Sequence, residues 1–453
     1  MKEFLQRARK AARTTTEPIR SPRAGALDAV KRSPLLYITP IMPQSRGNGL
    51  AMRAGLILEA LAKHHEVHLF VAPVAGDSGE APEFVRKQTA RIGVLPLRES
   101  LDTHYSLLAR LLDPQARFQA ELAYPKPQLS RFCTLPATAR LREWIAGVNF
   151  RAVHVMRLYL APLVDTFLRL PAARRPFCVL DLDDDEACTR QRLARIAEQN
   201  GDTEAAMLET AEAQKYREFQ KSYFPRFDRI LVCSAGDAAR VGAEFPNARF
   251  MIVPNGYRLP HEPPARASSD PKLLRLLFVG NLHYYPNSDA AVYLCRKVLP
   301  RLRRLTTRRI RIDLAGAGAA ATVGTLASES EVRVHDLVLD LTALYAAADT
   351  LVVPLRAGGG TRIKILEAFA RGVPVVSTAI GAEGIEAFDN VHLLLADTPE
   401  RFARACLRIK EHPEISLKLA CNSVALLAGN YSPAAIQRSV AAAYQGTDCI
   451  AAA

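Results

Sequence analysis

The chain of 453 residues contains no uninterrupted apolar run of the roughly 18 to 20 residues that a membrane-spanning helix requires. Its first thirty residues also lack the apolar block of a secretory signal peptide. The eight cysteines are widely scattered, with no CxxC pair and no spacing typical of a zinc site. These absences argue against a membrane span and a structural zinc centre, and they predict a cytoplasmic protein with reduced thiols.

Acidic residues are outnumbered, since 60 lysines and arginines face 46 aspartates and glutamates and give a net charge of +14. Residues 1–32 hold nine basic and three acidic residues, so we expect a flexible basic arm there. No basic stripe interleaved with aromatic residues accompanies the charge, and we therefore expect no nucleic-acid partner. Two roles stay open for the arm, which are a solvated tail and a peripheral contact with the anionic inner face of a membrane.

From Leu35 onward, short apolar runs suited to strands alternate with longer stretches of helical period, which predicts parallel sheets covered by helices. A Pro-rich polar stretch at 259–271 interrupts the alternation, which then begins again. We predict an α/β chain of two Rossmann-like domains whose sheets face a shared cleft. The expected parts are an arm at 1–33, a first domain at 34–258, a linker at 259–271, a second domain at 272–430, and a C-terminal helix at 431–453 that packs back on the first domain.

The most informative segment is 353–378, VPLRAGGGTRIKILEAFARGVPVVST, in which a strand, three glycines, a helix and a second strand follow one another. The glycines let the backbone approach a ligand closely, and their amides with the helix N-terminus offer donors to a phosphate. Arg362 and Lys364 add positive charge at the same end. Glu367 lies three residues beyond Lys364 on the same helix face, where a carboxylate can accept hydrogen bonds from two adjacent hydroxyls such as a ribose diol. A plain strand-to-helix loop does not account for all of these features together.

This segment resembles the nucleotide-diphosphate site of retaining GT-B glycosyltransferases of family 4, the glycosyl transferases of group 1. The resemblance rests on the pair Glu367-Ala368 with the following Gly-Val-Pro-Val-Val, and it extends more loosely from Leu35 to about Tyr431. It implies that the second domain binds the nucleotide-sugar donor and the first domain the acceptor. It also implies that Glu367 binds the ribose and that Lys364, with Arg362, stabilises the departing diphosphate. The residues that the resemblance places around the diphosphate are Gly358, Gly359, Gly360 and Thr361.

Two departures from the family pattern bear on the site. Gly359 stands where the family often has a second glutamate, eight residues before Glu367, so a direct carboxylate contact to the donor sugar is lost or comes from elsewhere. The family also commonly has an arginine and a lysine after the first strand of the second domain, whereas this chain reads Gly280-Asn281-Leu282-His283-Tyr284-Tyr285-Pro286-Asn287. We expect Arg362 and Lys364 to supply that charge instead.

The first domain offers weaker candidates. Gly47-Asn48-Gly49 precedes a helical run with Arg53 in its early turns, and we expect Gly49 and Arg53 to form a second anion-binding loop. Arg157 follows a strand at its carboxyl end and is a further candidate for the cleft. Five carboxylates at 181–186 leave three roles open, namely positioning of acceptor hydroxyls by Asp181 or Asp184, capping of a helix, and a less favoured divalent-metal pair.

Taken together, these features predict an enzyme that transfers a hexose-type unit from a nucleotide-diphosphate sugar to a carbohydrate or lipid-linked acceptor with retention of configuration, in polysaccharide or glycoconjugate biosynthesis. We place Lys364, Arg362, Asp181 and Arg157 among the catalytic candidates, and we expect neither a metal nor a cofactor to be required. The alternatives are a nucleotide-sugar epimerase or phosphorylase on the same fold, and a catalytically silent nucleotide-sugar-binding protein, which the glycine at 359 motivates.

Overall fold

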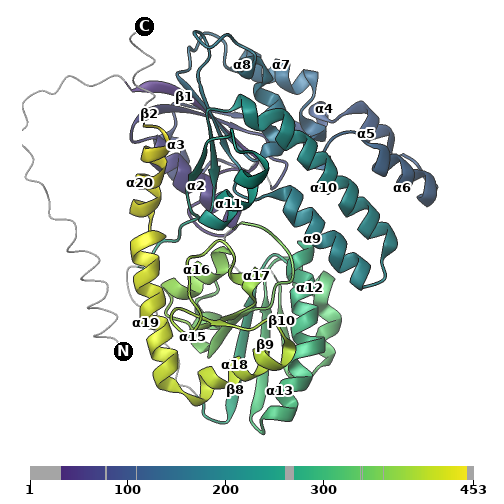
Figure 1. Ribbon diagram of the computed structural model, residues 1–453, viewed down its shortest axis with the longest axis vertical. Coiled ribbons are helices and arrows are strands. Elements are labelled where there is room, and N and C mark those ends of the chain that lie inside the picture. The colour runs from purple at the N-terminus through teal and green to yellow at the C-terminus, as the bar shows by residue number, and fades with distance from the viewer. Residues whose placement is uncertain are drawn as a thin grey trace, which may run out of the picture. The chain divides into compact units, whose positions relative to one another are not determined.

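The computed structural model describes residues 32–76, 79–108, 110–260, 270–336, 338, 340–360 and 362–445. These residues form two compact units (Figure 1). The N-terminal unit comprises the described residues up to Asn255 together with those from Ile436 onward, and the C-terminal unit runs from Gly256 to Ala435. Most of the predicted arm, residues 261–269 of the predicted linker, residues 446–453 and Thr361 lie outside the described residues.

The N-terminal unit contains a seven-stranded parallel sheet in the order β3-β2-β1-β4-β5-β6-β7. Its strands are β1 (Ser33–Thr39), β2 (His65–Val71), β3 (Arg91–Val94), β4 (Ala152–Met156), β5 (Phe177–Asp181), β6 (Arg229–Val232) and β7 (Phe250–Ile252). Side chains of β1 alternate between two buried clusters, with Leu36 and Ile38 in one and Leu35 and Tyr37 in the other. Both faces of the sheet are therefore covered, as parallel sheets require.

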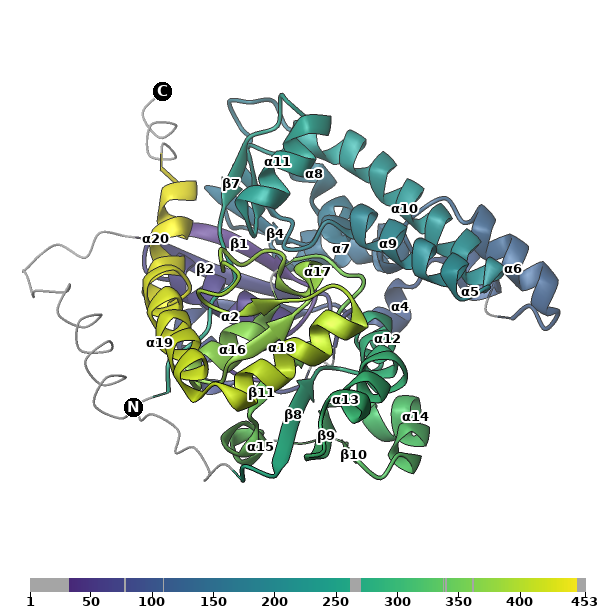
Figure 2. The ribbon, with the colours of Figure 1, turned by 60° about the horizontal axis from the view of Figure 1, so that its bottom comes forward.

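Helices cover this sheet, and a group of them extends beyond it. Figures 1 and 2 show α5, α6, α9 and α10 projecting away from the strands of this unit. The last helix, α20, contributes Ile436 and Val440 to the same buried cluster as Leu35. The α-helices of the unit are α2 (Gly49–Leu61), α3 (Glu83–Gln88), α4 (Leu97–Ser100), α5 (Thr103–Leu108), α6 (Pro114–Ala123), α7 (Leu135–Trp144), α8 (Asp165–Leu168), α9 (Glu186–Gln199), α10 (Thr203–Tyr223), α11 (Ala235–Glu244) and α20 (Pro433–Ala443).

The C-terminal unit contains a six-stranded parallel sheet in the order β10-β9-β8-β11-β12-β13, built around one buried cluster. Its strands are β8 (Leu273–Val279), β9 (Arg309–Ala315), β10 (Val332–His335), β11 (Thr350–Val353), β12 (Val375–Ser377) and β13 (Leu394–Leu395). Its α-helices are α12 (Tyr285–Tyr293), α13 (Leu299–Leu305), α14 (Ala319–Val323), α15 (Thr342–Ala347), α16 (Ile363–Ala370), α17 (Ala379–Ala382), α18 (Pro399–Glu411) and α19 (Pro413–Asn430). Two parallel, Rossmann-like sheets confirm the predicted α/β class.

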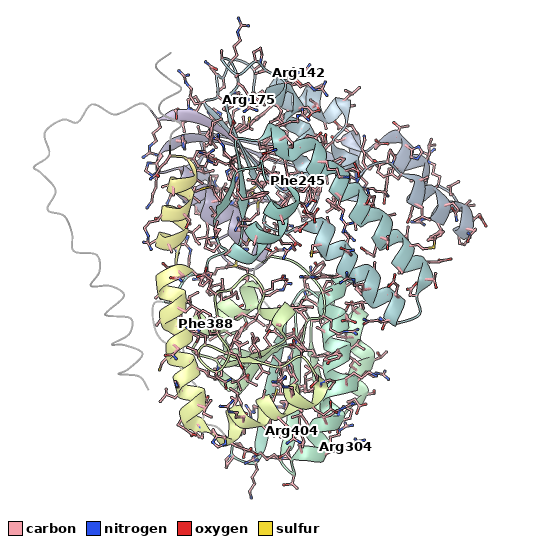
Figure 3. All side chains as sticks on the ribbon, in the orientation of Figure 1. Arg142, Arg175, Phe245, Arg304, Phe388 and Arg404 are labelled. Atoms are coloured by element: carbon pink, nitrogen blue, oxygen red, sulfur yellow. The ribbon has the colours of Figure 1, made fainter. Side chains whose placement is uncertain are left out.

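Positive charge is concentrated in one segment of the C-terminal unit as well as in the arm. Residues 296–311 hold eight lysines and arginines and no acidic residue, which together with the net +6 of residues 1–32 equals the +14 of the whole chain. Helix α13 of this segment packs against α18, and Figure 3 labels Arg304 and Arg404 on these two helices. Both side chains are exposed, so this helix pair presents a basic surface. None of the described helices is long and apolar enough to cross a membrane.

Candidate functional site

The order of the C-terminal strands points to one place on the sheet. Strand β8 lies between β9 and β11, so the chain proceeds outward in opposite directions from β8 and β11. Ligands of open parallel sheets bind at such a switch point, beside the carboxyl ends of the strands. Here the two flanking loops are 280–284, which leads into α12, and 354–362, which carries the three glycines and leads into α16. Arg356 of the second loop binds Asp289 of α12 with its Nε 2.9 Å from Oδ2, which ties the two segments together.

The glycine loop adopts a backbone that other residues rarely take. Gly358 has φ +116° and Gly360 has φ +65°, both in the region that favours glycine. A Cβ atom at Gly358 would also lie 3.0 Å from Nη2 of Arg362. Arg362 occupies the N-cap position of α16 and makes no capping hydrogen bond from its side chain. The side chain of an arginine cannot accept hydrogen bonds from the first-turn amides. Of these amides, that of Ile365 donates to the carbonyl oxygen of Arg362 at 2.9 Å, which leaves those of Ile363 and Lys364 as donors for an anion.

Arg362 and Lys364 have no anionic partner among the described residues. Nη1 of Arg362 donates to the carbonyl oxygens of Gly359 and Gly360, but its Nε and Nη2 are buried without a hydrogen-bond partner. Lys364 donates to the amide oxygen of Asn287, at 2.7 Å. Burial and the neighbouring charge of Arg362 lower the pKa of Lys364 to about 7. Two uncompensated cations at an uncapped helix end are the electrostatic complement of a diphosphate.

Glu367 lies on α16 three residues beyond Lys364 and is mostly buried. Its Oε1 accepts hydrogen bonds from Nε and Nη2 of Arg371, at 3.2 and 3.0 Å. Burial, followed by the charge of Glu367, raises the pKa of Tyr257 and of Tyr345, so both phenols adjoin this carboxylate. The surroundings of Glu367 are thus a polar, partly aromatic site next to the two cations.

The proposed second anion loop must be revised. Asn48 already caps α2, because its side chain accepts a hydrogen bond from the amide of Leu50 at 2.9 Å, in the first turn after Gly49. Arg53 is 2% exposed and binds Asp181 through Nη2 at 2.6 Å and through Nε at 2.9 Å. Asp181 has no exposed surface. The structure therefore places Arg53 and Asp181 in the interior as an ion pair.

Other contacts of Arg53 show what the pair does. Its Nη1 donates to the carbonyl oxygen of Val253 at 3.0 Å and to Oδ1 of Asn255 at 3.3 Å. Asn255 in turn donates to Oδ1 of Asp183 at 3.0 Å. Burial alone would raise the pKa of Asp181, but the charge and hydrogen bonds of Arg53 hold it well below its usual range. Arg53 thus joins α2, the end of β5 and the segment after β7, which is a structural role.

Arg157 lies at the carboxyl end of β4, as predicted, with φ +75° and a side chain that is 15% exposed. It binds Asp183 at 2.8 Å and Glu186 at 3.1 Å, so its charge is neutralised within the unit. Burial raises the pKa of Glu186 to about 8 despite Arg157. Asp184 accepts a hydrogen bond from Thr189 at 3.0 Å, while Asp185 caps α9. The carboxylate cluster therefore forms ion pairs and a helix cap, and the described residues contain no group of three or more metal-binding side chains in suitable positions.

The structure thus groups the C-terminal candidates, namely the glycines, Arg362, Lys364 and Glu367, on one loop and helix. Thr361 lies outside the described residues. Sequence patterns predicted neither the contact of Asn287 with Lys364 nor the tyrosines beside Glu367. For the Asn287 contact, the available signal was its position in the first turn of a helix that follows the β8 strand.

Comparisons with known proteins agree with this location. The family described as Glycosyl transferases group 1 matches residues 274–412, which include the whole glycine loop and α16. An uncharacterized 44.6 kDa protein in the cps region of Klebsiella pneumoniae is 24% identical over 173 residues. That alignment covers 36% of this chain and 44% of the relative, so the chain matches less than half the length of this curated protein.

Solved structures match nearly the whole chain. Sucrose-phosphate synthase from Thermosynechococcus elongatus superposes with a TM-score of 0.65 and 15% identity, covering 93% of this chain and 100% of that one. Anabaena Alr3699/HepE, solved in complex with UDP and glucose, superposes with a TM-score of 0.57 and 12% identity, covering 91% and 99%. At these identities the likeness establishes the fold alone. The chain therefore has the GT-B glycosyltransferase fold, and its residues 274–412 are similar in sequence to the glycosyl transferases of group 1.

Proposed function

We propose that the chain is a retaining glycosyltransferase that moves a hexose-type sugar from a nucleotide-diphosphate donor to a carbohydrate or lipid-linked acceptor. The observation that carries the proposal is the pair Arg362 and Lys364, two cations at the N-terminus of α16 for which the described part of the chain supplies no anionic partner. Leaving buried charges uncompensated is costly, and a bound diphosphate would remove that cost. The match of residues 274–412 to glycosyl transferases of group 1 supports the same assignment.

In this proposal the protein acts chiefly on the leaving group. The bond between the anomeric carbon and the diphosphate oxygen breaks, and its electron pair stays on that oxygen. The anomeric carbon bonds instead to an acceptor hydroxyl oxygen, whose proton passes to the departing diphosphate. Arg362, Lys364 and the first-turn amides of α16 stabilise the growing negative charge. Glu367 accepts hydrogen bonds from the ribose hydroxyls. Because these groups supply positive charge and donors themselves, we propose that transfer requires neither a metal ion nor a cofactor.

The setting of the reaction is part of the proposal. The relative encoded in the cps region of Klebsiella pneumoniae supports a role in polysaccharide biosynthesis. The complex of Alr3699/HepE with UDP and glucose makes UDP the first nucleotide to test. We also propose that the protein acts in the cytoplasm and that residues 1–32 contribute to contact with an anionic membrane surface.

A direct test measures the melting temperature of the protein with UDP, GDP and ADP and with their sugars, followed by transfer assays on the nucleotide that stabilises it. Stabilisation by one nucleoside diphosphate, with release of that nucleotide when acceptor is added, supports the proposal. NMR of the product then gives its anomeric configuration. Binding without turnover over a broad acceptor panel would favour a silent nucleotide-sugar-binding protein, and stabilisation by none of the nucleotides would overturn both.

A further inference from the structure

The contact between α12 and α16 extends the donor site beyond the glycine loop. Asn287 is 9% exposed and lies in the first turn of α12, 77 residues before Lys364 in the sequence. Its Oδ1 accepts the only hydrogen bond that Lys364 donates among the described residues, at 2.7 Å. Its Nδ2 donates to the carbonyl oxygen of Asn281 at 2.8 Å. An ammonium only donates and a carbonyl only accepts, so both contacts fix the same orientation of the amide.

The space around this contact leaves little room for another arrangement. Nζ of Lys364 lies 4.7 Å from the centroid of the Phe278 ring, so this ring restricts the position of the ammonium in addition to Asn287. A Cβ atom at Gly280 would lie 2.8 Å from Cγ of Asn287 and 2.9 Å from Nζ of Lys364. Asn287, Phe278 and the bare backbone of Gly280 therefore hold the ammonium at the end of β8, beside the switch point of the sheet.

We propose that Asn287 is a positioning residue of the donor site, which holds the Lys364 ammonium toward the diphosphate without contacting the donor itself. The inference rests on the proposed function, in which Lys364 binds the diphosphate of the donor. A neutral acceptor suits this task better than a carboxylate. The amide orients Lys364 but leaves its charge uncompensated, whereas an aspartate would form an ion pair and compete with the phosphate.

Because Asn287 is neutral, we expect the protonation of Lys364 to depend on whether a diphosphate is bound. Burial and Arg362 lower the pKa of Lys364 to about 7, so the free protein loses this proton just above neutrality. An opposite charge within about 4–6 Å shifts a pKa by roughly 1–3 units, so a bound diphosphate restores the proton. Binding then takes up a proton above pH 7. With a shift of this size, the affinity of the wild type for a nucleoside diphosphate should fall roughly five- to fiftyfold between pH 7 and pH 9.

Titration calorimetry with UDP, GDP and ADP tests this on the full chain from pH 7 to pH 9, where the second ionisation of the phosphate, near pH 6, is complete. Asn287→Asp should hold Lys364 charged across this range, so its affinity should be nearly independent of pH but roughly tenfold weaker at pH 7. Asn287→Ala removes the acceptor and lowers the pKa of Lys364 further, so its affinity should already be reduced at pH 7 and should fall again towards pH 9. The matched control is Ser288→Ala, because Ser288 is equally buried in the same helical turn and its hydroxyl donates to the carbonyl oxygen of Tyr285.

The outcomes separate the inference from the proposed function. Opposite shifts of the pH profile in the two Asn287 variants, with a wild-type profile for Ser288→Ala, support the positioning role. An aspartate in the first turn of a helix is favourable, so Asn287→Asp tests the idea even if the alanine variant does not fold. Identical pH profiles in all folded variants would overturn the inference and leave the donor site standing. Failure of the wild type to bind any of the three nucleotides would overturn the proposed function and the inference together.

Discussion

Substitution of Arg53 tests whether this side chain stabilises the fold or contacts a ligand. Arg53→Met keeps the length of the side chain but leaves the carboxylate of Asp181 buried without its partner. Breaking a buried ion pair in this way costs about 3–5 kcal/mol. With a urea dependence of about 2–3 kcal/mol per molar, the unfolding midpoint should fall by about 1–2.5 M. Asp181→Asn leaves Arg53 with the carboxylate of Asp183, 3.6 Å from its Nε, and should cost less.

The assay can isolate the N-terminal unit. Trp144 is the single tryptophan of the chain, and it packs on Phe70 with ring centroids 5.3 Å apart, so its fluorescence reports on this unit. The double variant Arg53→Met/Asp181→Asn should be less destabilised than the sum of the single variants by about 2 kcal/mol, since neither charge is then left alone. Nucleotide affinity should stay at the wild-type value.

The pH dependence follows from the lowered pKa of Asp181. The pKa is lower in the folded than in the unfolded state, so the stabilisation is present above the usual value of about 3.9 and is lost as the pH falls below it. The stability difference between the wild type and Arg53→Met should therefore narrow in acid. An unchanged unfolding midpoint with a tenfold loss of nucleotide affinity would refute the structural role and return Arg53 to the ligand site.

Three further outcomes are expected. Glu367→Ala should weaken nucleotide binding by about 1–3 kcal/mol in calorimetry, because the ribose hydroxyls lose their acceptor. The control, Glu414→Ala at an exposed position, should leave the affinity unchanged. Equal affinities of the two variants would show that Glu367 is not part of the site. Turnover should survive EDTA, and loss that only a divalent ion restores would contradict a metal-free mechanism. Deletion of residues 1–31 should reduce the fraction of protein that pellets with anionic liposomes. A greater reduction in the double variant Arg304→Glu/Arg404→Glu would assign liposome binding to the basic surface of α13 and α18 instead.

Strands and the glycine loop could be predicted because their signals are local in sequence. The short apolar runs interpreted as strands are strands in the structure, and the loop at 358–360 lies at the expected strand-to-helix junction. Strand β7 was missed because its apolar run is short and leads directly into the turn signal Val253-Pro254-Asn255-Gly256. Pairings between distant residues were also missed. Arg53 and Asp181 are 128 positions apart in the sequence. Each was predicted as a site residue because no nearby residue in the sequence indicates the ion pair that they form in the fold.

A comparison of the two glycine-containing helix starts shows why the C-terminal one is the stronger anion site. Both α2 and α16 follow a central strand of a parallel sheet and carry an arginine in or near the first turn. In α2, Asn48 satisfies the amide of Leu50 and Asp181 pairs with Arg53, so this helix start has one donor fewer and its arginine is already neutralised. In α16 the side chain of the N-cap residue makes no such bond, and Lys364 donates to a neutral amide. Similar local sequences thus give opposite electrostatics, because a distant carboxylate reaches one helix and a distant asparagine reaches the other.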